Sequence, residues 1–218
     1  MTRRRTRRKK PIPALLALAL ALLSLALGEY KGLLPTGTGQ GEEPIVQTGS
    51  EASPGQEPSA LPAADGAMTV HFIDVGQGDS LLAESDGHFL LVDAGENDQG
   101  DTVIAYLREA GVTSLDYVIG THPHSDHIGG LDDVIRAFDG KAVILPPVAH
   151  TTKTFEDVLD AVQEKNLTLT QPKPGDSYAL GDAAFTILAP QADYGDDLNN
   201  WSVGIRLACA EGALVACG

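Results

Sequence analysis

Short apolar runs separated by turn residues fill residues 68–218, and this pattern predicts alternating strands and helices. Strands are expected first at 69–75, 80–84 and 88–93, with a hairpin turn at Asp86 and Gly87 between the last two. Later strands are expected at 115–120, 142–145, 167–170, 183–188, 203–209 and 213–217. Because hairpins come first and strand–helix alternation follows, we expect mixed sheets with helices packed outside them.

Two segments between these strands have apolar residues at the spacing of a helix face. These sets are Leu131, Val134, Ile135 and Phe138, and then Phe155, Val158, Leu159 and Val162. A third helix is expected to begin with Asp101 as its N-cap and to stop at Gly111.

The first 28 residues join a basic stretch to an apolar one. Seven Lys and Arg lie within residues 1–10, and an apolar core follows at 14–27. This order is typical of a signal peptide, and the core is shorter than the roughly 20 residues of a spanning helix. The alternative is an uncleaved signal anchor, through which the chain would contact the membrane. Both alternatives predict a protein that is secreted, or membrane-anchored and facing outside the cell.

Residues 29–67 are rich in Gly, Pro, Ser and Glu and show no apolar periodicity. Such a segment cannot bury enough surface to offset its conformational entropy, so we expect a flexible linker. Residues 68–218 are then the one folded domain.

Charge is distributed unevenly along the chain. The formal net charge is −15, and from residue 68 onward there are 24 Asp and Glu against seven Lys and Arg. This balance excludes a broad basic face for nucleic acid, although not a nucleic acid gripped through metal ions. The two cysteines, Cys209 and Cys217, exclude a disulfide framework and leave one bridge between them as an open alternative.

The segment THPHSDHIGG at 121–130 holds the densest set of candidate ligands. His122 and His124 project to the same side of an extended loop, because alternate side chains share a face. Asp126 and His127 then turn toward the following helix. Imidazole nitrogen and carboxylate oxygen are ligands that zinc accepts, so we expect a metal site here, with zinc or another divalent ion.

Together with three other segments, this motif resembles the metallo-β-lactamase fold in its ComEC-like branch. The segments are HFIDVGQGDS at 71–80, LLVDAGEND at 90–98 and DLNNWSVGIRL at 197–207. That branch comprises the extracellular domain of DNA-uptake proteins and secreted stand-alone relatives. The resemblance implies an α/β fold, a four-layer αββα sandwich, with one or two zinc ions at one edge. It also implies an exported metal-dependent hydrolase, a phosphodiesterase or nuclease acting on DNA or on a cell-wall polymer.

The resemblance also assigns roles to residues. His122 and His124 would bind one metal, and Asp126 and His127 a second. Asp126 would in addition be catalytic, by orienting a metal-bound hydroxide that attacks the substrate.

Three further residues are candidates for contacts around the ligands. Asp93 would orient a ligating histidine, although it can also be read as a turn residue that ends a strand. Asn199 and Ser202 would line the pocket, with turn formation as the alternative for Asn199.

The family's pattern continues, after its last strand, with an aspartate that bridges both metals and a His-His-Gly-Ser segment. In this sequence, ALVACG resembles that strand and Gly218 is the last residue. We therefore expect a sandwich that is incomplete at the C-terminus, with two ligands per metal, weak metal binding and little hydrolysis. The alternative function is a non-catalytic module that lacks the bridging ligand.

Overall fold

A computed structural model describes residues 66–210 and 212–218 of the chain. The signal sequence expected at 1–28, and the linker expected at 29–67 except its last two residues, lie outside these ranges. Among the helices of the described ranges, none has the length and apolar character needed to cross a membrane.

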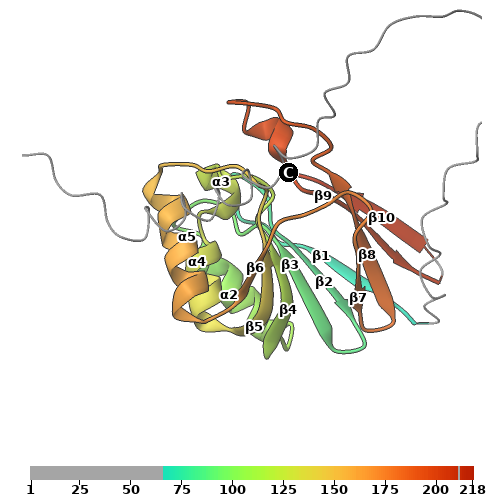
Figure 1. The fold of residues 1–218 in the computed structure, drawn as a ribbon. Coiled ribbons are helices and arrows are strands. Elements are labelled where there is room, and N and C mark those ends of the chain that lie inside the picture. The colour runs from blue at the N-terminus through green and yellow to red at the C-terminus, as the bar shows by residue number, and fades with distance from the viewer. Residues whose placement is uncertain (1–65, 211) are drawn as a thin grey trace, which may run out of the picture. The chain divides into compact units, whose positions relative to one another are not determined.

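Six strands form the first sheet, in the order β1-β2-β3-β4-β5-β6 (Figure 1). Their bounds are Thr69–Phe72, Leu81–Ser85, His88–Val92, Ser114–Ile119, Asp139–Ile144 and Thr168–Thr170. The first three strands pair antiparallel, and each later strand joins its neighbour in parallel. The predicted turn between β2 and β3 is present, with positive φ of 49° at Asp86 and 72° at Gly87, as a tight hairpin requires.

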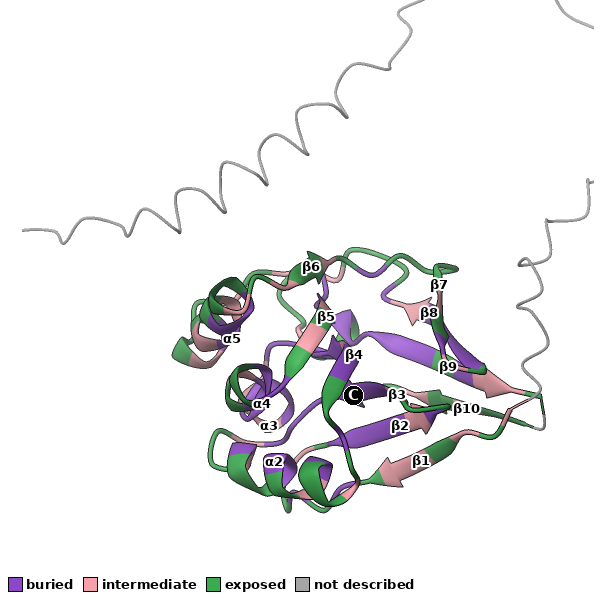
Figure 2. Ribbon diagram, turned by 90° about the horizontal axis from the view of Figure 1, so that it is seen from below, coloured by how far each residue is buried: buried purple, intermediate pink, exposed green. Residues whose placement is uncertain are grey.

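Four helices cover one face of this sheet (Figure 1). They are α2 (Gly100–Glu109), α3 (Ser125–Ile128), α4 (Leu131–Ala137) and α5 (Lys153–Glu164). The apolar faces predicted from helical spacing are buried here, for example at Leu131, Val134 and Val158. Burial of apolar surface between the helices and the sheet fixes this layer, and Figure 2 shows the buried residues on the inner sides of the elements.

Four antiparallel strands form the second sheet, in the order β10-β9-β8-β7. Their bounds, in chain order from β7, are Ser177–Leu180, Ala183–Ala189, Gly204–Cys209 and Gly212–Ala216. A second core lies between the sheets, where Phe185 and Leu207 meet Leu90 and Ile119. Helices, first sheet and second sheet are thus three layers of the αββα sandwich. The expected two sheets and outer helices are confirmed; the first sheet is mixed, whereas the second is antiparallel throughout. No α-helix in the described residues covers the outer face of the second sheet.

Several predicted boundaries were wrong in instructive ways. The strand expected at 69–75 ends at Phe72, because the following loop turns through positive φ at Gly76 and Gly78. Helix α2 begins at Gly100 behind Gln99, so Asp101 lies in its first turn and is not its N-cap. Strand β7 and the short helix α3 were not predicted.

The alternative of a bridge between Cys209 and Cys217 is wrong, since both thiols are free. Cys209 lies opposite Gly212 at the turn of the β9–β10 hairpin, whereas Cys217 follows the far end of β10. Five residues of strand separate Gly212 from Cys217, about 16 Å, and a disulfide needs Cα atoms within about 7 Å.

Candidate metal centre

The site lies where two parallel strands end side by side. Asp93 follows β3 and Thr121 follows β4, and the Asp93 N–H donates to the Ile119 carbonyl at 2.9 Å. Because the carboxyl ends of parallel strands meet at one edge, segments 28 residues apart come together there. The backbone of Asp93 has a positive φ of 57°, which turns its carboxylate back toward Thr121.

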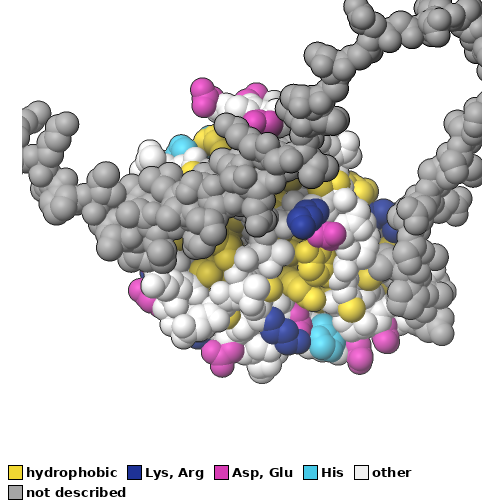
Figure 3. All heavy atoms as spheres, in the orientation of Figure 1, with side chains coloured by type: hydrophobic (Ala, Val, Ile, Leu, Met, Phe, Trp, Pro, Cys, Tyr) yellow, Lys and Arg dark blue, Asp and Glu magenta, His cyan; other side chains and the backbone are white. Residues whose placement is uncertain are grey.

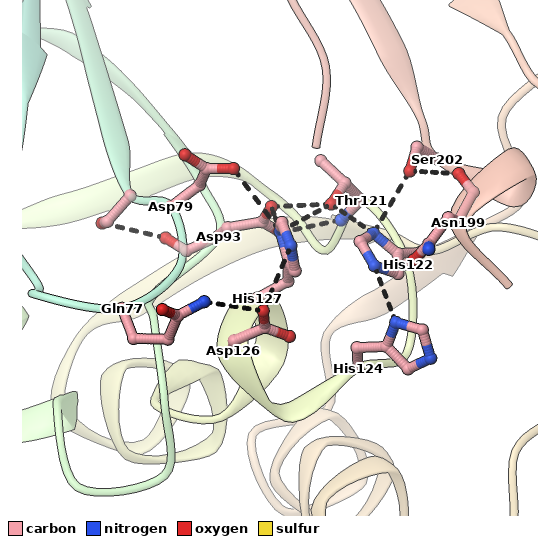
Figure 4. A network of polar contacts seen from close by, with 11 residues as sticks. Gln77, Asp79, Asp93, Thr121, His122, His124, Asp126, His127, Asn199 and Ser202 are labelled. Carbon is pink, nitrogen blue, oxygen red and sulfur yellow. Dashed lines mark hydrogen bonds and ion pairs between the residues drawn. The ribbon is translucent and has the colours of Figure 1, made fainter.

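Three histidine rings gather at this edge (Figure 4). His122 Nε2 lies 3.1 Å from His124 Nδ1, and the ring centroids of His122 and His127 are 4.1 Å apart. Asp126 Oδ2 lies 4.0 Å from His127 Nε2. The structure therefore brings the four predicted ligands together as two adjacent pairs, His122 with His124 and Asp126 with His127.

Asp93 binds the ring nitrogen of His127 that does not face Asp126. Its Oδ2 lies 2.9 Å from His127 Nδ1, and the carboxylate also accepts from the Thr121 N–H at 2.8 Å and the Thr121 hydroxyl at 2.6 Å. Asp93 is completely buried. With Nδ1 of His127 bound to a carboxylate, Nε2 is the nitrogen that faces Asp126 and is available to a metal.

The pKa values of the buried groups at the site shift in different directions. Burial, reinforced by the two neighbouring histidines, lowers the pKa of His122 to about 4, so its ring is neutral at pH 7. Burial alone would lower the pKa of His127, but the hydrogen bond to Asp93 and the Asp93 charge raise it above its usual value. Burial raises the pKa of Asp93, and the hydrogen bonds from His127 and Thr121 oppose that rise.

The loop before β2 forms another wall of the site. Gln77 Nε2 reaches to 3.5 Å from Asp126 Oδ2, and Asp79 Oδ2 lies 3.8 Å from His127 Nδ1 (Figure 4). Gly78 packs against the Asp126 carbonyl so closely that a Cβ there would lie 1.7 Å from that oxygen. Sequence reasoning missed Gln77 and Thr121 as residues of the site, because single polar residues carry no spacing signal.

The two pocket candidates from the second sheet lie beside His122. The short 3-10 helix η2 (Asn199–Trp201) precedes β9, and Ser202 directly after it places its Oγ 3.2 Å from His122 Nδ1. Asn199 approaches in two ways: its carbonyl accepts from Ser202 Oγ at 2.6 Å, and its side chain makes a hydrogen bond with His122 that acts to raise the pKa of that histidine. Both residues thus lie at the site, in contact with a predicted ligand.

The donor set fits a zinc ion in part. Two nitrogens bound to one tetrahedral zinc at 2.0–2.1 Å lie about 3.3 Å apart, close to the separation of His122 Nε2 and His124 Nδ1. The pair Asp126 and His127 is wider, and Asp126 is partly exposed and can rotate inward. Across residues 66–210 and 212–218, no three or more His, Cys, Asp and Glu side chains are arranged to hold one ion.

Several known proteins are similar to this chain in sequence or in fold. The sequence profile of the metallo-beta-lactamase superfamily matches residues 73–204. ComE operon protein 3 of Bacillus subtilis is 29% identical over 152 residues, which are 62% of this chain and 20% of that protein. Competence protein ComA of Neisseria gonorrhoeae is 34% identical over 131 residues, 60% of this chain and 17% of that protein.

Among solved structures, a Cronobacter sakazakii metallo-beta-lactamase with a HARLDQ motif superposes with a TM-score of 0.50. It is 14% identical and matches 67% of this chain and 60% of its own, so this likeness concerns the fold alone. The chain spans about a fifth of the competence-related proteins, and these matches support the ComEC-like branch. With its profile match, two-sheet fold and clustered histidines, this chain belongs to the metallo-beta-lactamase superfamily.

Proposed function

We propose that the protein is an exported metal-dependent phosphodiesterase or nuclease. The observation that carries this proposal is the placement of two candidate ligand pairs side by side, with the His122 and His127 rings 4.1 Å apart. Enzymes that cleave phosphate esters commonly hold two metals side by side, and two adjacent ligand pairs are what such a site needs.

Each residue has a distinct part in this proposal. His122 and His124 hold one ion, Asp126 and His127 hold a second, and Asp93 keeps His127 in orientation. Zinc, when bound, would supply a nucleophile at neutral pH and positive charge to stabilise the transition state. Asp126, partly exposed at the mouth of the site, is placed to accept a hydrogen bond from that nucleophile and so to orient it.

The charge of the chain bears on how a nucleic acid would be held. On the face in Figure 3, Lys and Arg side chains are scattered singly among acidic ones. Such a surface offers little of the phosphate contact that Lys and Arg normally supply, so the proposed grip on the substrate is through the metals. A DNA substrate is supported by the relative that is named a competence protein, and a cell-wall phosphodiester would use the same chemistry.

Export is supported by the basic and apolar sequence of residues 1–28. The proposal places the enzyme outside the cell, secreted or anchored in the membrane. Fractionation of cells that express the full chain tests it, because a cleaved signal releases the protein and an anchor retains it with membranes. Recovery in the cytoplasm would contradict the proposal.

A second candidate function is a non-catalytic module of the same fold. It is favoured by one observation, the lack of three ligands around any single point within the described residues. A catalytic zinc normally has three protein ligands, so a site with two per ion binds metal weakly.

One experiment separates the two functions. The full chain, titrated with zinc, is assayed on bis(p-nitrophenyl) phosphate and on a chromogenic β-lactam, and bound metal is counted by mass spectrometry. The proposal expects slow, zinc-dependent hydrolysis of the phosphodiester and none of the β-lactam. A folded chain that hydrolyses neither at any zinc concentration supports the non-catalytic module instead.

A further inference from the structure

The Ser202 hydroxyl lies between a carbonyl oxygen and the His122 ring. Its Oγ is 2.6 Å from the Asn199 carbonyl oxygen and 3.2 Å from His122 Nδ1. A carbonyl oxygen has no hydrogen to give, so at 2.6 Å the hydroxyl must donate to it. Since a hydroxyl carries one hydrogen, Ser202 can only accept from His122.

Thr121 presents a second acceptor to the same nitrogen. Its Oγ1 lies 2.6 Å from Asp93 Oδ2 and 3.2 Å from His122 Nδ1. The hydrogen of this hydroxyl goes to the carboxylate, which leaves its lone pairs for His122. His122 Nδ1 therefore faces two oxygen lone pairs, and a proton on Nδ1 is the arrangement that satisfies both.

From this geometry we infer that Ser202 is a positioning residue that holds His122 in the Nδ1–H tautomer, with the lone pair of Nε2 directed at the metal position. The inference deepens the proposed function and rests on it only for the identity of the ligands. It applies to the chain free of metal, so its test does not depend on hydrolysis.

The tautomer of His122 also determines that of His124. With no hydrogen on His122 Nε2, the 3.1 Å contact with His124 Nδ1 is a hydrogen bond that His124 donates. A metal held by these two nitrogens would take the place of that hydrogen. His124 would then have to carry its proton on Nε2, whereas His122 would keep its tautomer.

A residue next to the second sheet thereby orients His122, which follows a strand of the first sheet. Ser202 lies just before β9, and the next residue, Val203, donates its N–H to the Thr121 carbonyl at 2.9 Å. Ser202 is buried, with 9% of its surface exposed, so water does not replace its contact with His122 freely. A turn 80 residues away in sequence thus sets the direction of the His122 lone pair.

The direct test reads the tautomers by NMR. The full chain, labelled with ¹⁵N in its histidines, is measured by long-range proton–nitrogen correlation at neutral pH, without metal and with zinc. We expect a protonated Nδ1 on His122 in both states, and a proton that moves from Nδ1 to Nε2 on His124 when zinc binds. A protonated Nε2 on His122 in the free chain overturns the inference.

Variants of Ser202 test the residue itself. Ser202→Ala removes the acceptor, and we expect a mixture of His122 tautomers and about a tenfold loss of zinc affinity. Ser202→Thr keeps the hydroxyl and should retain both properties. Ser177→Ala removes an exposed hydroxyl on the second sheet and should change neither.

Fluorescence of Trp201, the chain's single tryptophan, shows whether the turn next to Ser202 is intact. With unchanged fluorescence, a Ser202→Ala chain that keeps one His122 tautomer and full zinc affinity overturns the role of Ser202. If Ser202→Ala loses the turn itself, the inference is tested on wild type and on Ser202→Thr instead. Both of these chains must carry the proton on Nδ1 of His122.

Discussion

Two buried aspartates at opposite ends of the β3–β4 pair each bind a histidine, and their surroundings differ in one respect. Asp93, at the carboxyl ends, accepts from His127 and Thr121 with no Lys or Arg in its hydrogen-bond network. Asp116, toward the amino ends, accepts from His88 Nδ1 and the Phe89 N–H and pairs with Lys141.

The difference appears in the pKa of each carboxyl. Burial raises the pKa of Asp93. Burial acts in the same direction on Asp116, but its hydrogen bonds and the charge of Lys141 outweigh it and lower the pKa. A carboxylate paired with Lys stabilises the fold, whereas Asp93 is left to act on His127, whose other nitrogen faces the candidate metal position. Of these two His–Asp pairs, the one at the candidate site is therefore the one whose carboxylate has no Lys or Arg in its hydrogen-bond network.

The largest difference between the two ends is expected when their histidines are removed. The double variant His122→Ala with His124→Ala removes both proposed ligands of one ion, so zinc binding there and hydrolysis should fall to background. His88→Ala, at the opposite end, should leave both unchanged. Zinc counting by mass spectrometry and the phosphodiester assay measure the two effects. Full activity with unchanged zinc content in the double variant would exclude this site.

Exchange of each aspartate for asparagine should have smaller effects, which again differ between the two ends. Asp93→Asn removes the carboxylate that accepts from His127 and Thr121, and we expect zinc affinity to fall about 10- to 100-fold. Loss of these buried hydrogen bonds should also lower the free energy of unfolding by about 1–3 kcal/mol.

Asp116→Asn is the matched control for that variant. It should reduce stability without changing zinc affinity, since Asp116 contacts none of the candidate ligands. Competition with a zinc chelator and urea unfolding give the two quantities. Equal losses of zinc affinity in both variants would show that Asp93 acts only through the stability of the fold.

Sequence reasoning identified most of the fold, because the elements it found are long or strongly patterned. The helical spacing of Leu131, Val134 and Ile135 survives as a buried face of α4. Strand β7 was missed because only Leu180 of its four residues is buried, so no apolar alternation marks it. The start of α2 was misplaced because its N-cap is Gln99, which makes no side-chain capping hydrogen bond and therefore carries no cap signal in the sequence.

Some residues of the candidate site could be predicted from the sequence, and others could not. The histidines could be predicted because they lie within six consecutive positions of one loop. The contact of Ser202 with His122 joins positions 80 residues apart, and that of Gln77 with Asp126 joins positions 49 apart. Such contacts depend on how the second sheet and the loop before β2 pack, and local pattern does not determine either.

The smallest effect is the pH dependence of the Asp116 end. Because the folded pKa of Asp116 is lowered, its ionised form adds stability above its unfolded pKa, about 3.9, and this is lost as pH falls through the folded pKa. Measured by urea unfolding from pH 7 to pH 3, the free energies of unfolding of wild type and Asp116→Asn should therefore converge at acid pH. Lys141→Met should have a free energy of unfolding between those two at pH 7, since it removes the cation that favours the carboxylate. A gap that stays constant across this range would mean that Asp116 stabilises the fold by shape alone, and the contrast with Asp93 would lose its electrostatic basis.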